Sequence, residues 1–251
     1  MAANGKREML YEGKAKQIFA TDDPEVLFHR YKDDATAYNA EKRGSWEGKG
    51  RTNAMMSAAI FKYLEEHGVP THFLRQEDET SITTKNLQML PVEVVVRNVA
   101  AGSLSRLLGI EEGTPLKEPI IELCLKSDEL GDPMLTHAHF RELGVAEEDL
   151  VAAEEIGRRV NEILTSFFDE KGITLVDFKI EVGRDRGGEL MLADEISPDT
   201  CRFWDKETGE KLDKDRFRRD MGGVEEAYAE MLRRVTSDQR SAISSQQGTN
   251  S

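Results

Sequence analysis

LVDFKIEVGRDRGGELMLADEISPDTCRFW, residues 175–204, combines a strand pattern with a dense set of charged side chains. Residues 176–181 alternate apolar and polar side chains, which is typical of a strand with one face of each kind. The polar positions are Asp177, Lys179 and Glu181. We therefore expect three ionisable side chains on one face of this strand.

The residues that follow predict an antiparallel hairpin. Residues 184–188, RDRGG, are rich in turn-forming glycine, and residues 189–193 resume a strand pattern. Folding about this turn brings Asp194 level with Lys179 and Glu181. One ammonium group and two carboxylates would then lie together, and a solvated strand face with ordinary cross-strand ion pairs is the alternative interpretation.

Two carboxylates on neighbouring strands suit Mg²⁺, which prefers oxygen ligands and keeps positions open for substrate phosphates. A lysine beside them can meet phosphate oxygens as a point charge. The end of the stretch, DEISPDTCR at residues 194–202, favours a functional site. Acids, hydroxyls and an arginine crowd a strand end there, and loops on a rigid scaffold often carry chemistry.

The composition restricts the classes of function. The 251 residues include 48 acidic and 34 basic side chains, which gives a net charge of -14 and a pI near 4.9. Such an acidic chain is a poor general binder of nucleic acid or of an anionic membrane. Its length allows one large domain or two smaller lobes that share a cleft.

The cysteines and the first residues predict a soluble, cytoplasmic protein. Cys124 and Cys201 are too few for a disulfide framework and lie in no CxxC pair, so we expect both to be reduced. The first ten residues, MAANGKREML, lack the apolar core of a signal peptide. No apolar run approaches the roughly 20 residues that a membrane-spanning helix needs.

Residues 9–20, MLYEGKAKQIFA, predict a strand, a short turn and a second strand. Gly13 would let the backbone approach a ligand closely. Lys14 and Lys16 point the same way if the segment is extended. The turn could cover nucleotide phosphates, although a solvated hairpin tip would have the same pattern.

Residues 91–97, PVEVVVR, give the strongest strand pattern in the chain, and their apolar continuity predicts a strand buried on both sides. Arg97 ends this strand, and Gly102 and Ser103 begin a predicted helix. A guanidinium, a hydroxyl and free backbone N–H groups would form an anion site. Alternatively, Ser103 only caps the helix and Arg97 pairs with an acid.

Other patterns predict scaffold elements. The segment after Asn53 and residues 146–171 are expected to form amphipathic helices that stop at Gly68 and Gly172. His137 and His139 lack a nearby cysteine or third histidine, which disfavours a metal site. Residues 236–251 are rich in Ser and Gln and predict a disordered tail. The remaining predictions are strands at residues 26–31, 71–74, 81–85 and 120–125, and helices at residues 104–108, 213–221 and 224–235.

Four motifs in this order, LYEGKAK, PVEVVVR with AAGS, VDFKIEVG and LADEISPDTCRFWD, closely resemble those of the SAICAR synthetase family. The resemblance extends from Leu10 to Val235. It implies an α+β, two-lobed fold with an ATP cleft between the lobes, and a homodimer. The expected parts are a strand-rich N-terminal lobe with an antiparallel sheet at residues 1–88, a larger α+β lobe at residues 89–235, and the tail.

The resemblance also implies an activity. A member of this family would be an ATP- and Mg²⁺-dependent ligase in de novo purine biosynthesis. It would join L-aspartate to 5-amino-1-(5-phospho-D-ribosyl)imidazole-4-carboxylate (CAIR), releasing ADP and phosphate and forming the amide SAICAR. A carboxylate resists attack by an amine, so ATP would first convert its oxygen into a leaving group, most simply as an acyl phosphate.

The resemblance assigns residues to each role. The ATP contacts would be Gly13, Lys14, Ala15, Lys16, Lys85, Met89 and Lys126. The substrate contacts would be Asn39, Arg97, Ser103, Asp199, Arg202, Lys214 and Arg218. Glu181 and Asp194 would bind Mg²⁺, Lys179 would neutralise charge at the reacting carboxylate, and Asp177 or Asp199 is a candidate proton acceptor.

One loop departs from the family pattern, and two other functions fit the same residues. The family loop commonly reads Phe-Asn-Gly, whereas this chain has Tyr38, Asn39 and Ala40. A kinase-like phosphotransferase could use the same lysines and carboxylates to phosphorylate a hydroxyl. A nucleotide-binding regulator without catalysis would bind ATP and not consume it.

Overall fold

The computed structural model describes residues 8–37 and 42–247. Five antiparallel strands form the first sheet, in the order β1-β2-β3-β7-β6. Their bounds are β1 (Met9–Glu12), β2 (Lys16–Ala20), β3 (Val26–Tyr31), β7 (Ser81–Lys85) and β6 (Phe73–Asp78). The strand predictions for residues 9–20, 26–31 and 81–85 are confirmed, and the strand predicted at 71–74 begins two residues later.

The second sheet has the order β11-β10-β8-β9, and β12 also pairs with β10. Its strands are β11 (Leu190–Ala193), β10 (Ile173–Arg184), β8 (Gln88–Val99), β9 (Pro115–Leu125) and β12 (Cys201–Asp205). Val92, Val94 and Val96 of β8 are fully buried on one face, as predicted, whereas the opposite face carries the buried charges of Glu93 and Arg97 and a half-buried Val95. The sequence did not predict β12.

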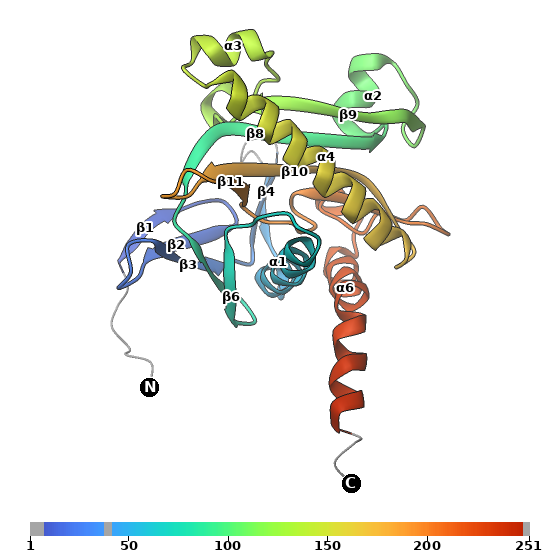
Figure 1. Cartoon of the computed structure of the whole chain (residues 1–251). Coiled ribbons are helices and arrows are strands. Elements are labelled where there is room, and N and C mark those ends of the chain that lie inside the picture. Colours follow the sequence, from blue (N-terminus) through green and yellow to red (C-terminus); the bar gives the residue numbers. More distant parts are fainter. Residues whose placement is uncertain (1–7, 38–41, 248–251) are drawn as a thin grey trace.

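Helices pack against both sheets (Figure 1). α4 (Glu147–Asp169) lies across the second sheet, where Gly157 allows a close approach to Val94. α1 (Lys49–Glu66) packs against the first sheet and against α6 (Val224–Gln247). One apolar cluster contains residues of both sheets, so the two sheets share a core.

Smaller elements complete the fold. A hairpin of β4 (Asp34–Ala37) and β5 (Lys42–Ser45) was not predicted, because its charged, glycine-containing residues lack a strand pattern. The others are α2 (Gly102–Leu108), the 3₁₀ turn η1 (Asp128–Leu130), α3 (His137–Glu142) and α5 (Asp215–Arg218).

The C-terminal helix is longer than the sequence indicated. We predicted that helical structure ends at Val235, but α6 continues to Gln247. Residues 236–247 contain neither Gly nor Pro, and Ser and Gln are tolerated in helices, so no strong signal stops the helix. Within the described part of the chain, no helix is both long and apolar enough to cross a bilayer. The division into lobes at residue 88 stays a prediction.

Candidate active site

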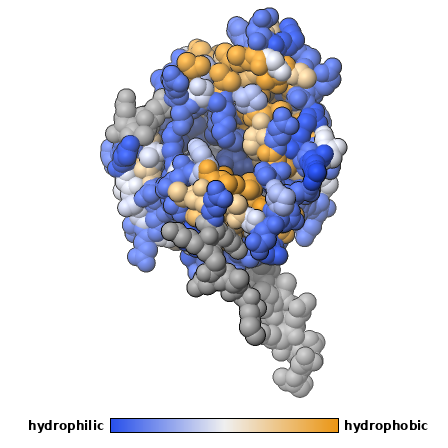
Figure 2. Space-filling model, turned by 90° about the vertical axis from the view of Figure 1, so that its left-hand side faces the viewer, coloured by the Kyte–Doolittle hydropathy of each residue, from blue (hydrophilic) through white to orange (hydrophobic). Residues whose placement is uncertain are grey.

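A pocket of about 610 Å³ lies between the two sheets. Figure 2 shows a hollow on this face that is bordered by both hydrophilic and hydrophobic residues. Thirteen of the predicted site residues line the pocket: Gly13, Lys14, Ala15, Lys16, Lys85, Met89, Lys126, Lys179, Glu181, Asp194, Asp199, Lys214 and Arg218. The structure thus brings together most of the ATP, metal and catalytic candidates.

The predicted hairpin forms the centre of the pocket. β10 and β11 pair in antiparallel register with Glu181 opposite Ala193, so Asp194 follows immediately beside Glu181. The backbone of Asp194 has φ 66°, a left-handed conformation that is uncommon for a residue other than glycine. Such conformations persist where surrounding contacts enforce them, often at functional sites. The close placement of the two carboxylates confirms the geometry that the hairpin pattern predicts.

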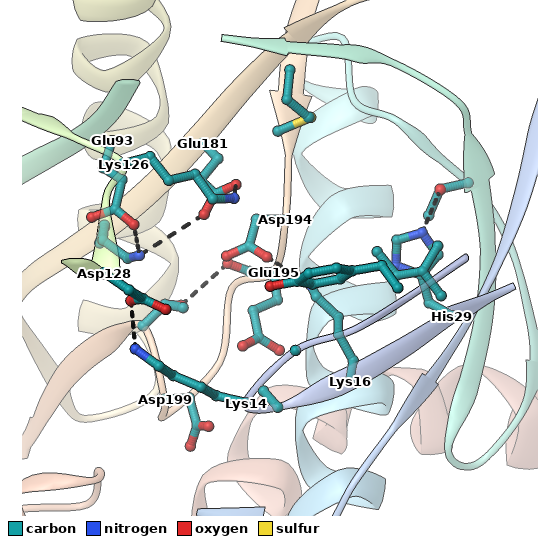
Figure 3. Close-up of a pocket in the computed structure, with 18 of the residues that line it drawn as sticks. Lys14, Lys16, His29, Glu93, Lys126, Asp128, Glu181, Asp194, Glu195 and Asp199 are labelled. Carbon is teal, nitrogen blue, oxygen red and sulfur yellow. Dashed lines mark hydrogen bonds and ion pairs between the residues drawn. The ribbon is translucent and has the colours of Figure 1, made fainter. Parts of the chain in front are cut away.

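Lysines surround the two carboxylates (Figure 3). Lys16 Nζ lies 2.6 Å from Asp194 Oδ1, and Lys126 donates a hydrogen bond to Glu181. Burial raises the pKa of Asp194, but Lys16 and Lys179 outweigh burial and hold this pKa below its usual range. Burial and the neighbouring Asp194 together raise the pKa of Glu181. The surroundings therefore favour the charged form of Asp194 and disfavour that of Glu181, which a bound cation would stabilise.

The carboxylate pair fits Mg²⁺ better than a fully protein-coordinated metal. Among residues 8–37 and 42–247, no cluster of three or more His, Cys, Asp or Glu side chains could hold a metal ion. Mg²⁺ is commonly bound by only one or two carboxylates together with substrate phosphates and water. Glu181 and Asp194 supply two buried carboxylates beside lysines that can face phosphates. This donor set therefore fits the predicted ion.

Lys179 is fixed by a carboxylate that the sequence analysis missed. Its ammonium donates to Glu93 of β8 and lies 3.9 Å from Glu181 Oε1. Burial lowers the pKa of Lys179, but Glu93, Asp194 and Glu181 outweigh burial and raise this pKa above its usual value. Lys179 therefore stays protonated and can serve as a fixed positive charge. Glu93 was detectable as the single acid within the valine run of residues 92–96.

The turn between β1 and β2 carries Lys14 and leads into Lys16, which are both predicted to bind phosphates. The backbone N–H of Gly13 donates to the carbonyl of Lys16 at 2.8 Å and closes the turn. Lys14 Nζ lies 2.5 Å from Asp128 Oδ1, and both side chains are partly exposed. Lys14 and Lys16 both line the pocket, and the ammonium group of each is paired with an aspartate.

One end of the pocket combines apolar side chains with two buried histidines. Ile18, Leu27 and Met89 line this part of the wall. Burial, with Lys16 as a further cause, lowers the pKa of His29 well below its usual value and that of His72 to about 3. Both imidazoles are therefore neutral, and His29 Nε2 lies 3.1 Å from Thr84 Oγ1. Neither histidine was a sequence candidate.

Four predicted site residues lie beside the pocket and do not line it. Arg97 Nη1 and Arg202 Nη1 both bond Asp177 Oδ2, at 3.0 and 2.7 Å, and Arg97 Nη2 donates to Ser103 Oγ at 3.0 Å. Arg97 also pairs with Glu122, so it pairs with acids as the alternative interpretation expects, and its role in an anion site stays a prediction. Ser103 does not cap α2, since Ala101 holds that position without a side-chain bond.

This network reaches the pocket through Asp215. Arg202 Nε lies 3.0 Å from Asp215 Oδ2, and Arg218 Nη1 lies 2.6 Å from Asp215 Oδ1. Arg218 lines the pocket, so the charged residues form a continuous connection from Arg97 to the pocket wall. The remaining candidate, Asn39, lies outside the described residues.

Both predicted proton acceptors are already engaged. Asp177 receives two guanidinium groups on one oxygen. Burial raises the pKa of Asp199, but Lys214 and Lys49 outweigh burial and hold this pKa below its usual range. Glu195, which the sequence analysis did not select, lines the same pocket. Burial raises its pKa to about 7, and its Oε2 has no hydrogen-bond partner within the described chain.

The two histidines of the sequence analysis belong to the scaffold. His137 Nδ1 lies 2.7 Å from Glu147 and its Nε2 lies 3.0 Å from Glu154, so this ring connects α3 with α4. His139 Nδ1 accepts a hydrogen bond from the backbone N–H of Thr136 and closes a capping box. These contacts give both rings a structural role in the segment that precedes α4.

The fold and the pocket define a class, namely a two-lobed α+β protein with an inter-sheet site suited to a phosphorylated ligand and a divalent cation. Residues 9–235 match the sequence profile of SAICAR synthetase, which is nine-tenths of the chain. The chain belongs to the SAICAR synthetase family, as its motifs indicate.

Two curated relatives and two solved structures illustrate the similarity. The phosphoribosylaminoimidazole-succinocarboxamide synthase of Deinococcus radiodurans is 55% identical over 230 residues, covering 91% of this chain and 97% of the relative. That of Brevibacillus brevis is 53% identical over 234 residues, covering 93% and 98%.

A SAICAR synthetase (Type-2) structure in complex with ADP has a TM-score of 0.88 and 50% identity, covering 90% of this chain and 97% of its own. The Pyrococcus horikoshii structure has a TM-score of 0.86 and 49% identity, covering 89% and 98%. The predicted fold class is confirmed.

Proposed function

We propose that this chain is an ATP-dependent ligase that joins L-aspartate to CAIR and forms SAICAR in purine biosynthesis. The observation that carries this proposal is the pocket, where lysines of the first sheet meet the carboxylates of the second sheet. The names of its curated relatives support the reaction, and a solved relative that is described as an ADP complex supports the use of ATP.

The proposed reaction has two steps. A carboxylate oxygen of CAIR attacks the γ-phosphorus of ATP, the bond from that phosphorus to ADP breaks, and a mixed acyl phosphate forms. The amine of L-aspartate then attacks the acyl carbon, the C–N bond forms, and inorganic phosphate leaves with the C–O bonding electrons. The amine loses a proton to an acceptor in the site. Phosphoryl transfer needs mainly positioning and charge neutralisation, which fixed lysines provide.

The proposed ATP contacts come from the first sheet, from β8 and from the residue that follows β9. Lys14 and Lys16 would bind phosphate oxygens, with the backbone of Gly13 and Ala15 closing over them. Lys85 and Met89 line the more apolar end, which suits a base. Lys126 would contact the phosphates from its position beside Glu181.

Glu181 and Asp194 are the proposed Mg²⁺ ligands. The ion, when bound, would polarise phosphate oxygens and reduce the repulsion between ATP and the attacking carboxylate. Lys16 and Lys126, which now pair with these carboxylates, would be free to turn towards the phosphates. Lys179 keeps its charge through Glu93 and would neutralise the reacting carboxylate of CAIR.

The charged network beside the pocket is the proposed site of the ribose phosphate. Arg202 and Arg218 have side chains that are 18% and 30% exposed, whereas that of Arg97 is 9% exposed. The first two can reach a phosphate directly, and Arg97 with Ser103 would support the network from behind. Asp177, Asp199, Lys214 and Asn39 complete the proposed contacts. Asp199 lines the pocket and Asp177 does not, so Asp199 is the proposed proton acceptor.

We also propose a cytoplasmic homodimer with residues 1–88 and 89–235 as its two lobes. Two free cysteines suit a reducing compartment. Leu107 and Leu108 of α2 are exposed apolar residues that could contribute to an interface. Light scattering on the purified chain would measure the mass directly, and a monomer at micromolar concentration would contradict the dimer.

Release of ADP, measured with each component omitted in turn, tests the proposed function. The ligase requires ATP, Mg²⁺, CAIR and L-aspartate for continuous release. A phosphotransferase would release ADP without L-aspartate, and a regulator would bind ATP and release no ADP. Either of these results would contradict the proposal.

A further inference from the structure

Three elements that are far apart in sequence converge on one carboxylate of the pocket wall. Lys49, the first residue of α1, has its Nζ 2.8 Å from Asp199 Oδ2. Tyr228 of α6 donates its hydroxyl proton to Asp199 Oδ1 at 2.6 Å. Lys214 Nζ, which precedes α5, lies 3.4 Å from Asp199 Oδ2. Both oxygens of Asp199 are therefore held in place.

The burial of Lys49 is the unusual part of this arrangement. Its side chain is 0% exposed and that of Asp199 is 4% exposed. A buried ammonium is costly unless a carboxylate compensates it, so removal of either partner would leave an uncompensated buried charge. α1 also holds the same loop through Ser57, whose hydroxyl lies 3.2 Å from the carbonyl oxygen and 3.3 Å from the N–H of Ile196.

Only part of this group contacts the pocket. Asp199 and Lys214 are among its lining residues, whereas Lys49 and Tyr228 are not and lie behind Asp199. Lys49 and Tyr228 therefore make no direct contact with a ligand in the pocket, and Asp199 is the lining residue that both of them hold. Asp199 in turn determines where the ammonium of Lys214 lies on the wall.

We propose that Lys49 and Tyr228 are positioning residues that hold Asp199 in one orientation, so that Lys214 is presented to the carboxylate-bearing substrates. This inference rests on the proposed ligase function. Without Lys49, Asp199 would lose its buried counter-charge and draw Lys214 towards itself. The partners of the ATP-binding lysines, Asp128 for Lys14 and Asp194 for Lys16, lie outside this group.

The test compares Lys49→Met and Tyr228→Phe with Lys62→Met, a control at an exposed position of the same helix. We expect kcat/KM for L-aspartate to fall about tenfold or more in Lys49→Met and about threefold in Tyr228→Phe. The KM for ATP should stay within about twofold of wild type, and Lys62→Met should match wild type. The double variant should resemble Lys49→Met alone, because both changes act through Asp199 and are not additive.

Wild-type kinetics in a folded Lys49→Met variant would overturn the inference. A parallel rise in the KM values for ATP and L-aspartate would also overturn it, because that result indicates a general distortion of the pocket. If Lys49→Met does not fold, Tyr228→Phe decides alone, since it removes only a hydroxyl. A wild-type protein that releases no ADP in response to L-aspartate would instead overturn the proposed function, and this inference with it.

Discussion

Lys16 and Asp194 form an ion pair across the pocket, with 2.6 Å between Lys16 Nζ and Asp194 Oδ1. The two residues are 178 positions apart and belong to different sheets. Lys16 is the first residue of β2, and Asp194 follows the last residue of β11. In the proposed function Lys16 binds a phosphate and Asp194 binds Mg²⁺. A bound nucleotide would then replace this ion pair.

Removal of either proposed metal ligand should abolish turnover without unfolding the protein. Asp194→Asn keeps the left-handed backbone accessible, since asparagine tolerates that conformation, and Glu181→Gln keeps the side-chain shape. We expect kcat/KM to fall about a hundredfold or more, because a Lewis-acid ion contributes several kcal/mol to the transition state. Glu189→Gln, at an exposed position of the same hairpin, is the control. Activity near wild type in either variant would refute the metal assignment.

Lys14→Ala should weaken ATP binding more than aspartate binding. Lys14 is exposed in part and pairs with Asp128, so its loss should not disturb the core. We expect the KM for ATP to rise about tenfold, which corresponds to about 1.4 kcal/mol. Steady-state kinetics with Lys32→Ala as a control would measure this, because Lys32 pairs with Glu12 and Asp34 and does not line the pocket. A larger rise in the KM for L-aspartate would count against the phosphate role.

Gly157→Ala should destabilise the fold although alanine favours a helix. A Cβ at this position of α4 would lie 2.8 Å from Val94 Cγ1 and 3.3 Å from Val96 Cγ2. Alanine improves helix propensity by about 1 kcal/mol, whereas overpacking a core costs about 1–3 kcal/mol. We expect a net loss of about 1 kcal/mol in urea unfolding. An unchanged or higher midpoint would show that α4 does not rest this closely on β8.

Stability should depend on pH through His137. Hydrogen bonds to Glu147 and Glu154 raise the pKa of His137 above its usual value. A raised folded-state pKa contributes stability that is complete below the unfolded-state pKa of about 6.5 and is lost as the pH rises through the folded-state value. The free energy of unfolding, relative to His137→Gln, should therefore fall as the pH rises from about 6.5 through the raised folded-state pKa of His137. A difference that stays constant or grows over this range would contradict the role of the ion pairs.

The hairpin that carries the metal candidates was predictable because strand periodicity and turn residues fix its register locally. Lys179, Glu181 and Asp194 therefore lie together as expected. The positions of Arg97 and Ser103 were less predictable, since Asp177 and Glu122 draw the guanidinium away from the pocket. Such pairing depends on side chains from three strands, which no local pattern encodes.

Other site residues were missed because their signals are weak in sequence. Lys49 lies between two glycines and looks like part of a flexible loop, but Gly48 adopts φ 82° and α1 begins directly after it. The sequence marks Tyr228 only as part of a helix. Its hydroxyl meets Asp199 once α6 has packed beside α1. Long-range packing therefore decides which polar groups support the pocket.

A crystal structure with an ATP analogue and Mg²⁺ tests the central claim most directly. We predict that carboxylate oxygens of Glu181 and Asp194 lie about 2.0–2.1 Å from an Mg²⁺ ion that also binds phosphate oxygens. Lys16 should then contact a phosphate in place of Asp194. Phosphates bound away from these two carboxylates, or an ion held by other residues, would contradict the account.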